Sequence, residues 1–166
     1  AAQNGKVEST GPLTDAEVPE QVRQSLDLKG YRLVLDEPNP ACEIWLRKSI
    51  PGQTKKDTAR VAYPQLAEST LVGVVHFLHA AADFRGQRVR AGFYTLRYAV
   101  IPDDGNHLGV SPNPDFLLLI PAQSDSDPSA AFKFQELVTI SAKTLGTKHP
   151  SPLSLPRKTG IGRCIP

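Results

Sequence analysis

Short apolar runs, separated at close intervals by turn-forming residues, constrain the fold of this chain most. In residues 31–36 (YRLVLD) and 93–100 (FYTLRYAV), apolar and polar side chains alternate with a period of two. That period places alternate side chains on opposite faces of a β-strand. The 12 glycines and 15 prolines among 166 residues supply turns between such runs. The pattern predicts one domain built from short antiparallel strands.

Three further segments fit this pattern. Residues 41–51 (ACEIWLRKSIP) are expected to pair with the first run as its antiparallel neighbour. The valine-rich segment 70–82 favours a strand over a helix, and a strand would send His76 and His79 to opposite faces. The run 115–121 (DFLLLIP) lacks alternation, which is typical of a central strand covered on both sides.

One helix is predicted over residues 134–145, where apolar residues follow helical spacing and Gly146 stands at the expected stop. The predicted fold is therefore all-β, an antiparallel β-sandwich of jelly-roll or immunoglobulin-like type with one C-terminal amphipathic helix. The expected boundaries are a polar N-terminal extension over 1–28, the sandwich domain over 29–150 and a basic, proline-rich tail over 151–166.

Charge is unevenly distributed, although the net charge is only +2. No acidic residue follows Glu136, whereas five basic residues do: Lys143, Lys148, Arg157, Lys158 and Arg163. Two interpretations stay open, a solvated tail or a segment that docks on an acidic partner. No nucleic-acid-binding motif accompanies the basic residues, so nucleic acid is not a predicted partner.

The compartment is inferred from the termini and the cysteines. No segment has the ~20 apolar residues of a transmembrane helix. The start AAQNG suits cleavage of a signal peptide and predicts an exported protein, periplasmic or extracellular, although removal of an initiator methionine would leave the same start. In an exported protein Cys42 and Cys164 would form a disulfide. Alternatively, Cys42 is a small buried residue and Cys164 a free thiol.

The segment 102–115 (PDDGNHLGVSPNPD) is the main candidate for a binding site. Its candidate ligands are Asp103, Asp104, Asn106, His107 and Asp115. Oxygen-rich loops of this kind can hold a hard cation such as calcium, but the spacing departs from the regular calcium-binding loop. Turn formation also uses Asp and Asn beside Gly and Pro, so a purely structural loop is the alternative. A weaker metal site would use His107 with Asp104.

Two other residues are candidates on different grounds. Trp45, placed on the outward face of its strand, could stack on a sugar, cover an apolar seam or meet another subunit. Arg97 stands among apolar and aromatic residues and is expected to stack on Tyr94 or to pair with Asp115. The sequence has no G-x-S-x-G nucleophile elbow and no phosphate-binding glycine loop, so catalysis has little support.

A resemblance covers about half of the chain, from Phe84 to Pro121 with a weak extension toward His149. The shared positions are Gly86, Gly92, Tyr94, Leu96, Arg97, Tyr98, Asp104, Gly105, His107, Gly109, Ser111, Asp115 and Phe116. On these residues the chain resembles a group of exported bacterial proteins, a family that brings no known reaction. The ending RKTGIGRCIP does not resemble the further strand that such proteins carry, which implies an uncovered sheet edge and a partner there.

These observations predict a non-catalytic, exported β-sandwich that acts as an accessory or interaction subunit of a larger assembly, without a cofactor. Its N-terminal extension and basic tail are expected to contact the partner protein. The alternative is a ligand-binding domain, for a cation or a carbohydrate, centred on the loop from Asp103 to Asp115 or on Trp45. A hydrolase or metal enzyme using His107 with Asp104 is the least favoured class.

Overall fold

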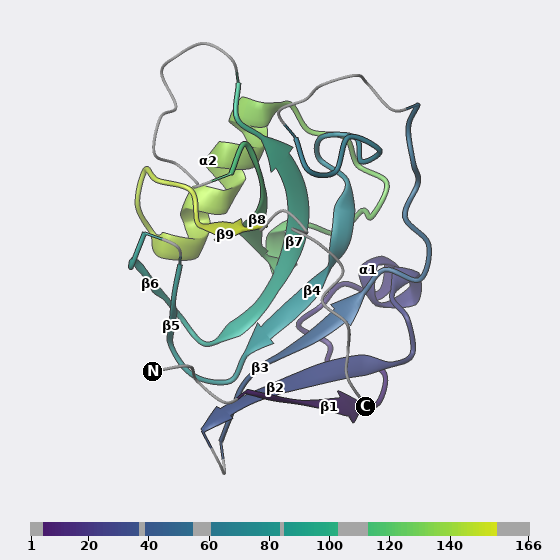
Figure 1. Ribbon diagram of the computed structural model, residues 1–166, viewed down its shortest axis with the longest axis vertical. Helices are drawn as coiled ribbons and strands as arrows, with labels where there is room; N and C mark the ends of the chain where they lie inside the picture. Colours follow the sequence, from purple (N-terminus) through teal and green to yellow (C-terminus); the bar gives the residue numbers. More distant parts are fainter. Residues whose placement is uncertain (1–4, 37–38, 55–60, 84, 103–112, 156–166) are drawn as a thin grey trace.

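The computed structural model describes residues 5–36, 39–54, 61–83, 85–102 and 113–155. Its main feature is one seven-stranded sheet in the order β1-β2-β3-β4-β7-β8-β9, in which all neighbours are antiparallel (Figure 1). A separate two-stranded hairpin, β5–β6, lies between β4 and β7 in the chain. The strands are β1 (Lys6–Thr10), β2 (Gly30–Asp36), β3 (Asn39–Leu46), β4 (Leu71–Phe77), β5 (Ala81–Ala82), β6 (Arg88–Val89), β7 (Gly92–Val100), β8 (Asp115–Pro121) and β9 (Pro152–Ser154).

The prediction of a mostly antiparallel β structure is confirmed, because β2, β3, β4, β7 and β8 fall on the segments with strand patterns. β3 is the neighbour of β2, as expected from their alternation. The segment 70–82 is indeed extended, with β4 ending at Phe77. The described strands do not form two stacked sheets of similar size, since β5 and β6 contribute only two residues each.

The strand β7, which arches across the molecule, defines the two faces of the main sheet (Figure 1). Tyr94, Leu96 and Tyr98 point to one face, called face A below, and belong to a single apolar cluster. Thr95 and Arg97 point to the opposite face, called face B, because successive side chains alternate along a strand. The cross-strand register carries this alternation from β1 to β9.

Two helices cover face B. The short helix α1 (Glu20–Ser25) packs beside β3 and β4, in a cluster made of Val18, Val22, Leu26, Trp45, Leu71, Val74 and Ala122. The helix α2 (Phe134–Leu145) packs on β8, in a cluster made of Ala99, Phe116, Leu118, Ile120 and Leu137. Each of these large side chains contributes on the order of 1.5–3 kcal/mol of hydrophobic free energy when buried. Face B of these strands therefore forms one part of the core, and the buried cluster on face A of β4, β7 and β8 forms another.

The predicted helix over 134–145 is confirmed residue for residue. At its start the backbone N–H of Lys133 donates to the Glu136 carboxylate at 2.7 Å. At its end Gly146 takes the left-handed conformation, with φ of 65°, which glycine adopts without steric cost. Between them the hydroxyls of Ser141 and Thr144 donate to the backbone carbonyl of Leu119, which ties α2 to β8.

The expected domain boundaries need correction at both ends. Residues 5–28, predicted as part of a polar extension, supply β1, which pairs with β2, and the core helix α1. Residues 152–154, predicted as part of the tail, form β9 against β8. Both segments are held by backbone hydrogen bonds or apolar packing, so they belong to the same folded body as the sheet.

Candidate functional site: the apolar face of the sheet

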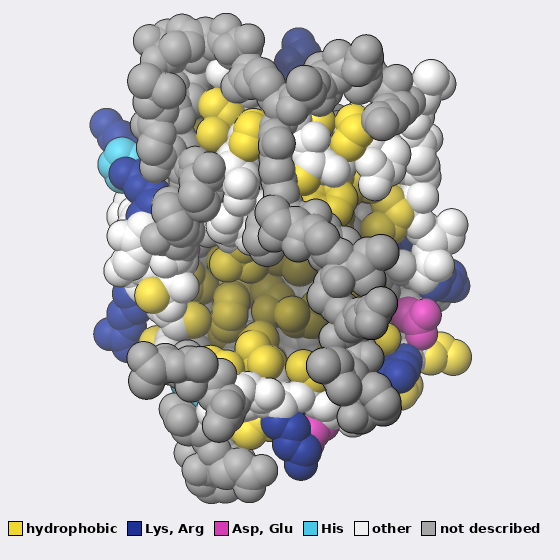
Figure 2. Space-filling model, in the orientation of Figure 1, with side chains coloured by type: hydrophobic (Ala, Val, Ile, Leu, Met, Phe, Trp, Pro, Cys, Tyr) yellow, Lys and Arg dark blue, Asp and Glu magenta, His cyan; other side chains and the backbone are white. Residues whose placement is uncertain are grey.

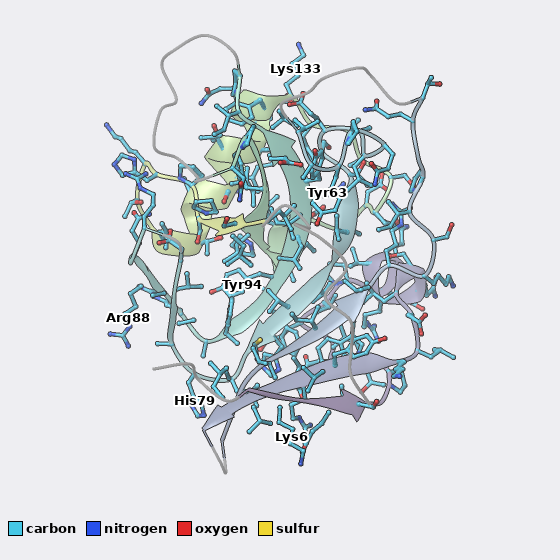
Figure 3. The ribbon with its side chains drawn as sticks, viewed as in Figure 1. Lys6, Tyr63, His79, Arg88, Tyr94 and Lys133 are labelled. Carbon is cyan, nitrogen blue, oxygen red and sulfur yellow. The ribbon has the colours of Figure 1, made fainter. Side chains whose placement is uncertain are left out.

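Face A carries mostly apolar side chains across the main sheet. Over β7 and β8 it is covered by side chains from the loop 61–66 and from the β5–β6 hairpin, including Tyr63, Leu66, Ala81 and Val89. Figure 2 shows a hollow with an apolar floor over β4 and β7. In Figure 3 the charged side chains of Lys6, Arg88 and Lys133 lie at the periphery of the view, away from this floor.

Among the described residues, the cover is incomplete over β1, β2 and β3. Val7 is 64% exposed, Tyr31 39% and Leu46 44%. The register places all three on face A, because Val7 pairs with Leu33, Tyr31 with Ile44, and Leu46 with Gly73, which in turn pairs with Leu96. Leu33 and Ile44 beside them are only partly buried. These strands thus present a continuous apolar surface to solvent, which monomeric proteins rarely do.

The opposite face of the same strands is polar at Arg32 and Glu43, and it is apolar at Trp45, where α1 covers it. On face B the guanidinium of Arg32 donates to the Glu43 carboxylate at 2.7 and 2.9 Å, and His76 lies 3.3 Å from the same carboxylate. The His76 ring stacks on Phe93 with a centroid distance of 3.9 Å. In an antiparallel sheet with one solvated face, that face is polar and the apolar face packs against another layer. Face A is the side of β1–β3 that lacks such a layer among the described residues.

Asp115 fastens the loop over face A. It is the first residue of β8 and is fully buried. Its Oδ2 accepts hydrogen bonds from the backbone N–H groups of Ala62 at 2.9 Å and Tyr63 at 3.0 Å, and from the Tyr98 hydroxyl at 3.1 Å. Burial, and then the Asp115 charge, raise the pKa of Tyr98 above its ordinary value. Asp115 therefore acts as a structural anchor for the loop 61–66.

The other loop candidates, Asp103, Asp104, Asn106 and His107, lie outside the described residues. Calcium binding by that loop accordingly stays a prediction. In the part of the chain that the structure describes, no group of three or more His, Cys, Asp or Glu side chains is placed to hold a metal ion.

Trp45 does not lie on an outward face. It is only 4% exposed, packs with α1 on face B, and donates its indole N–H to the Gly11 carbonyl at 2.9 Å. The expectation of an outward ring available to a sugar is wrong, because α1 and the segment before it cover this side of β3. The alternation along the strand is as predicted, but both sides of β3 carry buried residues, Cys42 on face A and Trp45 on face B.

Arg97 is fully buried and pairs with Asp125, not with the expected Asp115. Its Nη2 and Nε donate to the two Asp125 oxygens at 2.7 and 2.9 Å. The other donors reach the backbone carbonyls of Ser69, Ala130 and Asp127 at 2.7–3.0 Å. All five guanidinium donors are satisfied, so the group is a structural clamp on the segment 125–130.

Cys42 is buried on face A of β3 and forms no disulfide with another described residue, and Cys164 lies outside the described residues. Burial, and secondarily the charge of Glu43, raise the pKa of the Cys42 thiol. A protonated thiol among Val75, Tyr94 and other apolar neighbours behaves as a small core residue. The pairing of Cys42 with Cys164 stays a prediction.

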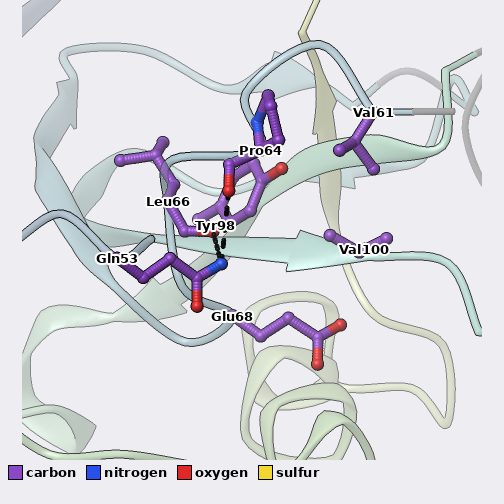
Figure 4. Close-up of a pocket in the computed structure, with 7 residues that line it drawn as sticks. All are labelled: Gln53, Val61, Pro64, Leu66, Glu68, Tyr98 and Val100. Carbon is purple, nitrogen blue, oxygen red and sulfur yellow. Dashed lines mark hydrogen bonds between the residues drawn. The ribbon is translucent and has the colours of Figure 1, made fainter. Parts of the chain in front are cut away.

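A pocket of about 300 Å³ opens between the loop 61–68 and the end of β7 (Figure 4). Its lining is mostly apolar and consists of Gln53, Val61, Pro64, Leu66, Glu68, Tyr98 and Val100. The polar side chains of Gln53 and Glu68 belong to no motif recognised in the sequence. Tyr98 and Val100 belong to face A of β7, so the pocket continues the apolar face at the end of the strand. Both polar residues lie in irregular segments, where only the folded chain reveals their proximity.

Comparisons with known proteins add no identification: no family model, curated protein or solved structure matches this chain. The resemblance to exported bacterial proteins therefore stays a prediction. Neither helix in the described ranges is long and apolar enough to span a membrane.

Proposed function

We propose that this chain is a non-catalytic interaction subunit whose face A docks on an extended, apolar segment of a partner protein. The exposure of Val7, Tyr31 and Leu46 on one face of the sheet carries the proposal. Domains are built from at least two packed layers, and the helices supply the second layer on face B only. A partner on face A would supply the missing layer.

A polypeptide fits this surface better than a small ligand does. The uncovered area extends over three adjacent strands, which are spaced about 4.8 Å apart, and a second sheet packs at about 10 Å from the first. Such a layer would complete the two-layered sandwich that the sequence predicts. The proposed contact differs from the one expected from sequence, because the N-terminal residues 5–28 are folded into the sheet and core.

The buried charged groups support a binding role over a catalytic one. Arg97 and Asp125 are paired through two hydrogen bonds, and Asp115 holds the loop 61–66. Asp83 accepts hydrogen bonds from the Arg85 and Gln87 backbone within its own turn. Each of these groups has a local structural task.

The test uses photo-crosslinking from face A. A benzophenone side chain replaces Leu46, and in a control protein it replaces Leu28, which is 77% exposed but lies outside the sheet. We expect position 46 to link one partner protein from the native source, and position 28 to leave that partner unlinked. The purified partner is then titrated against Leu46→Lys and Leu28→Lys variants of equal thermal stability. The first substitution should weaken binding at least 10-fold and the second should not change it.

Two results would overturn the proposal. Equal affinity of the two lysine variants for the linked partner would show that face A is not the contact. Cross-links from position 46 only to the chain's own residues or to a second copy would assign the surface to a different occupant.

A further inference from the structure

The pocket at the end of face A has a polar composition that selects one kind of ligand. The Gln53 amide nitrogen donates to the carbonyls of Pro64 at 3.3 Å and Leu66 at 3.1 Å (Figure 4). Two nearby carbonyls also fix which end of this amide is nitrogen, so its oxygen is the end left for a ligand. Gln53 therefore offers the pocket an acceptor and no donor.

The Tyr98 hydroxyl also uses its hydrogen-bond donor within the protein. Its single proton lies between the Asp115 carboxylate at 3.1 Å and the Tyr63 carbonyl at 3.3 Å. A tyrosine hydroxyl has one proton to donate, so none is left for a ligand. A tyrosine hydroxyl keeps its proton at neutral pH, and burial raises the pKa of Tyr98 further above its ordinary value.

Glu68 gives the pocket its charge. Its side chain lines the pocket, lies in an exposed position, and has no ion pair or hydrogen bond to any other described residue. Among the polar side chains of the lining, Glu68 and Gln53 offer a ligand acceptor atoms and no free donor. The remaining walls, made by Val61, Pro64, Leu66 and Val100, are apolar. A ligand that matches these walls carries hydrogen-bond donors and a positive charge at one end of an apolar stem.

We propose that this pocket binds the side chain of a lysine or arginine of the docked partner segment. The cationic head would lie between Glu68 and the Gln53 oxygen, and the methylene stem against the apolar walls. A volume of about 300 Å³ is at the lower limit of small-molecule sites, which suits one long side chain. The inference rests on the proposed function, since the pocket continues face A, and it adds a charge requirement to the partner.

The first experiment measures the pocket alone with defined probes. Backbone and side-chain amide NMR shifts are followed during titration with Nα-acetyl-lysine amide and with Nα-acetyl-norleucine amide, which has a similar stem without the charge. We expect millimolar binding of the lysine probe, with shifts at the Gln53 amide and at Leu66, and at least 5-fold weaker binding of the norleucine probe. The Glu68→Gln substitution should weaken binding of the lysine probe at least 5-fold. The control Glu17→Gln, at another exposed glutamate, should not.

Three outcomes would overturn the inference. They are equal binding of the two probes, an unchanged lysine affinity in Glu68→Gln, and lysine-induced shifts that map outside the pocket. A further outcome would overturn it as well. Lysine binding that emerges only after Lys55, Lys56 and Arg60 are all replaced by glutamine would assign the pocket to a basic side chain of the segment 55–60, between Gln53 and Val61 in the sequence.

A second experiment separates this inference from the proposed function. The partner linked at position 46 is titrated against Glu68→Gln and Leu46→Lys. Loss of affinity in both variants supports both proposals. Loss in Leu46→Lys with no change in Glu68→Gln leaves face A as the docking surface and removes the basic side chain from the pocket.

Discussion

Removal of the Asp125 carboxylate should destabilise the protein more than any change of a surface charge. Asp125 and its partner Arg97 have side chains that are 1% and 0% exposed. Asp125→Ala leaves a buried guanidinium without its counter-charge and without two of its five acceptors. It also removes the acceptor of the Thr95 hydroxyl, which lies 2.6 Å from Asp125 Oδ2.

The expected loss is about 3–5 kcal/mol of unfolding free energy, which is typical when one partner of a buried ion pair is deleted. Stability is measured by urea unfolding at pH 7, followed by the fluorescence of the single tryptophan, Trp45, which is buried in the folded state. The control is Glu8→Ala. Glu8 forms an exposed ion pair with Lys6 at 2.8 Å, and because solvent screens such a pair, its loss should leave the unfolding free energy almost unchanged.

A double substitution tests the reasoning further. Arg97→Met combined with Asp125→Leu removes both charges, so it should cost less than the two single substitutions added together, by about 2 kcal/mol or more. Additive single effects, or an Asp125→Ala protein as stable as Glu8→Ala, would refute the view that this pair is a tightly coupled buried clamp.

Three other predictions concern the core. The pKa of Tyr98 is raised in the folded state, so the unfolded chain releases the hydroxyl proton first as pH rises above about 10. The unfolding free energy should therefore fall above that pH. Tyr98→Phe should reduce this fall, as measured by urea unfolding between pH 9 and 11. The thiol of Cys42, in a variant lacking the other cysteine, should react with a disulfide reagent in the native protein far more slowly than in urea, and equal rates would contradict its burial. A Cβ on Gly30 would overlap the Trp45 indole, so Gly30→Ala should cost about 1–3 kcal/mol in thermal unfolding, whereas Gly11→Ala, with open space around it, should cost less than about 1 kcal/mol.

Local patterns in the sequence predicted the strands and α2 well. The period-two alternation of residues 93–100 and the uninterrupted run 115–121 correspond to β7 and β8. The helical spacing before Gly146 fixed both ends of α2. These features depend on side-chain periodicity and on glycine conformation, which are properties of a short segment and need no knowledge of the rest of the chain.

What covers each face could not be predicted in the same way. Alternation shows that Trp45 and Leu46 lie on opposite sides of β3, but the position of α1 decides which side is the core. The Arg97 partner was missed for a related reason. Asp115 is the cross-strand neighbour of Val100, so its side chain lies on face A. The Arg97 side chain lies on face B, so the two side chains cannot meet. Asp125 reaches Arg97 only through the turn after β8, a geometry that carries no sequence signature.

The meander order of the main sheet has a consequence for synthesis and folding. Each strand of the main sheet pairs with the strand before it in that sheet, so the first four can assemble one after another while later residues are still being translated. The helix that covers their face B precedes β2 in the chain and is available at once. Their other face has no such early cover, which makes this four-stranded intermediate the stage at which a nascent chain would most need a chaperone.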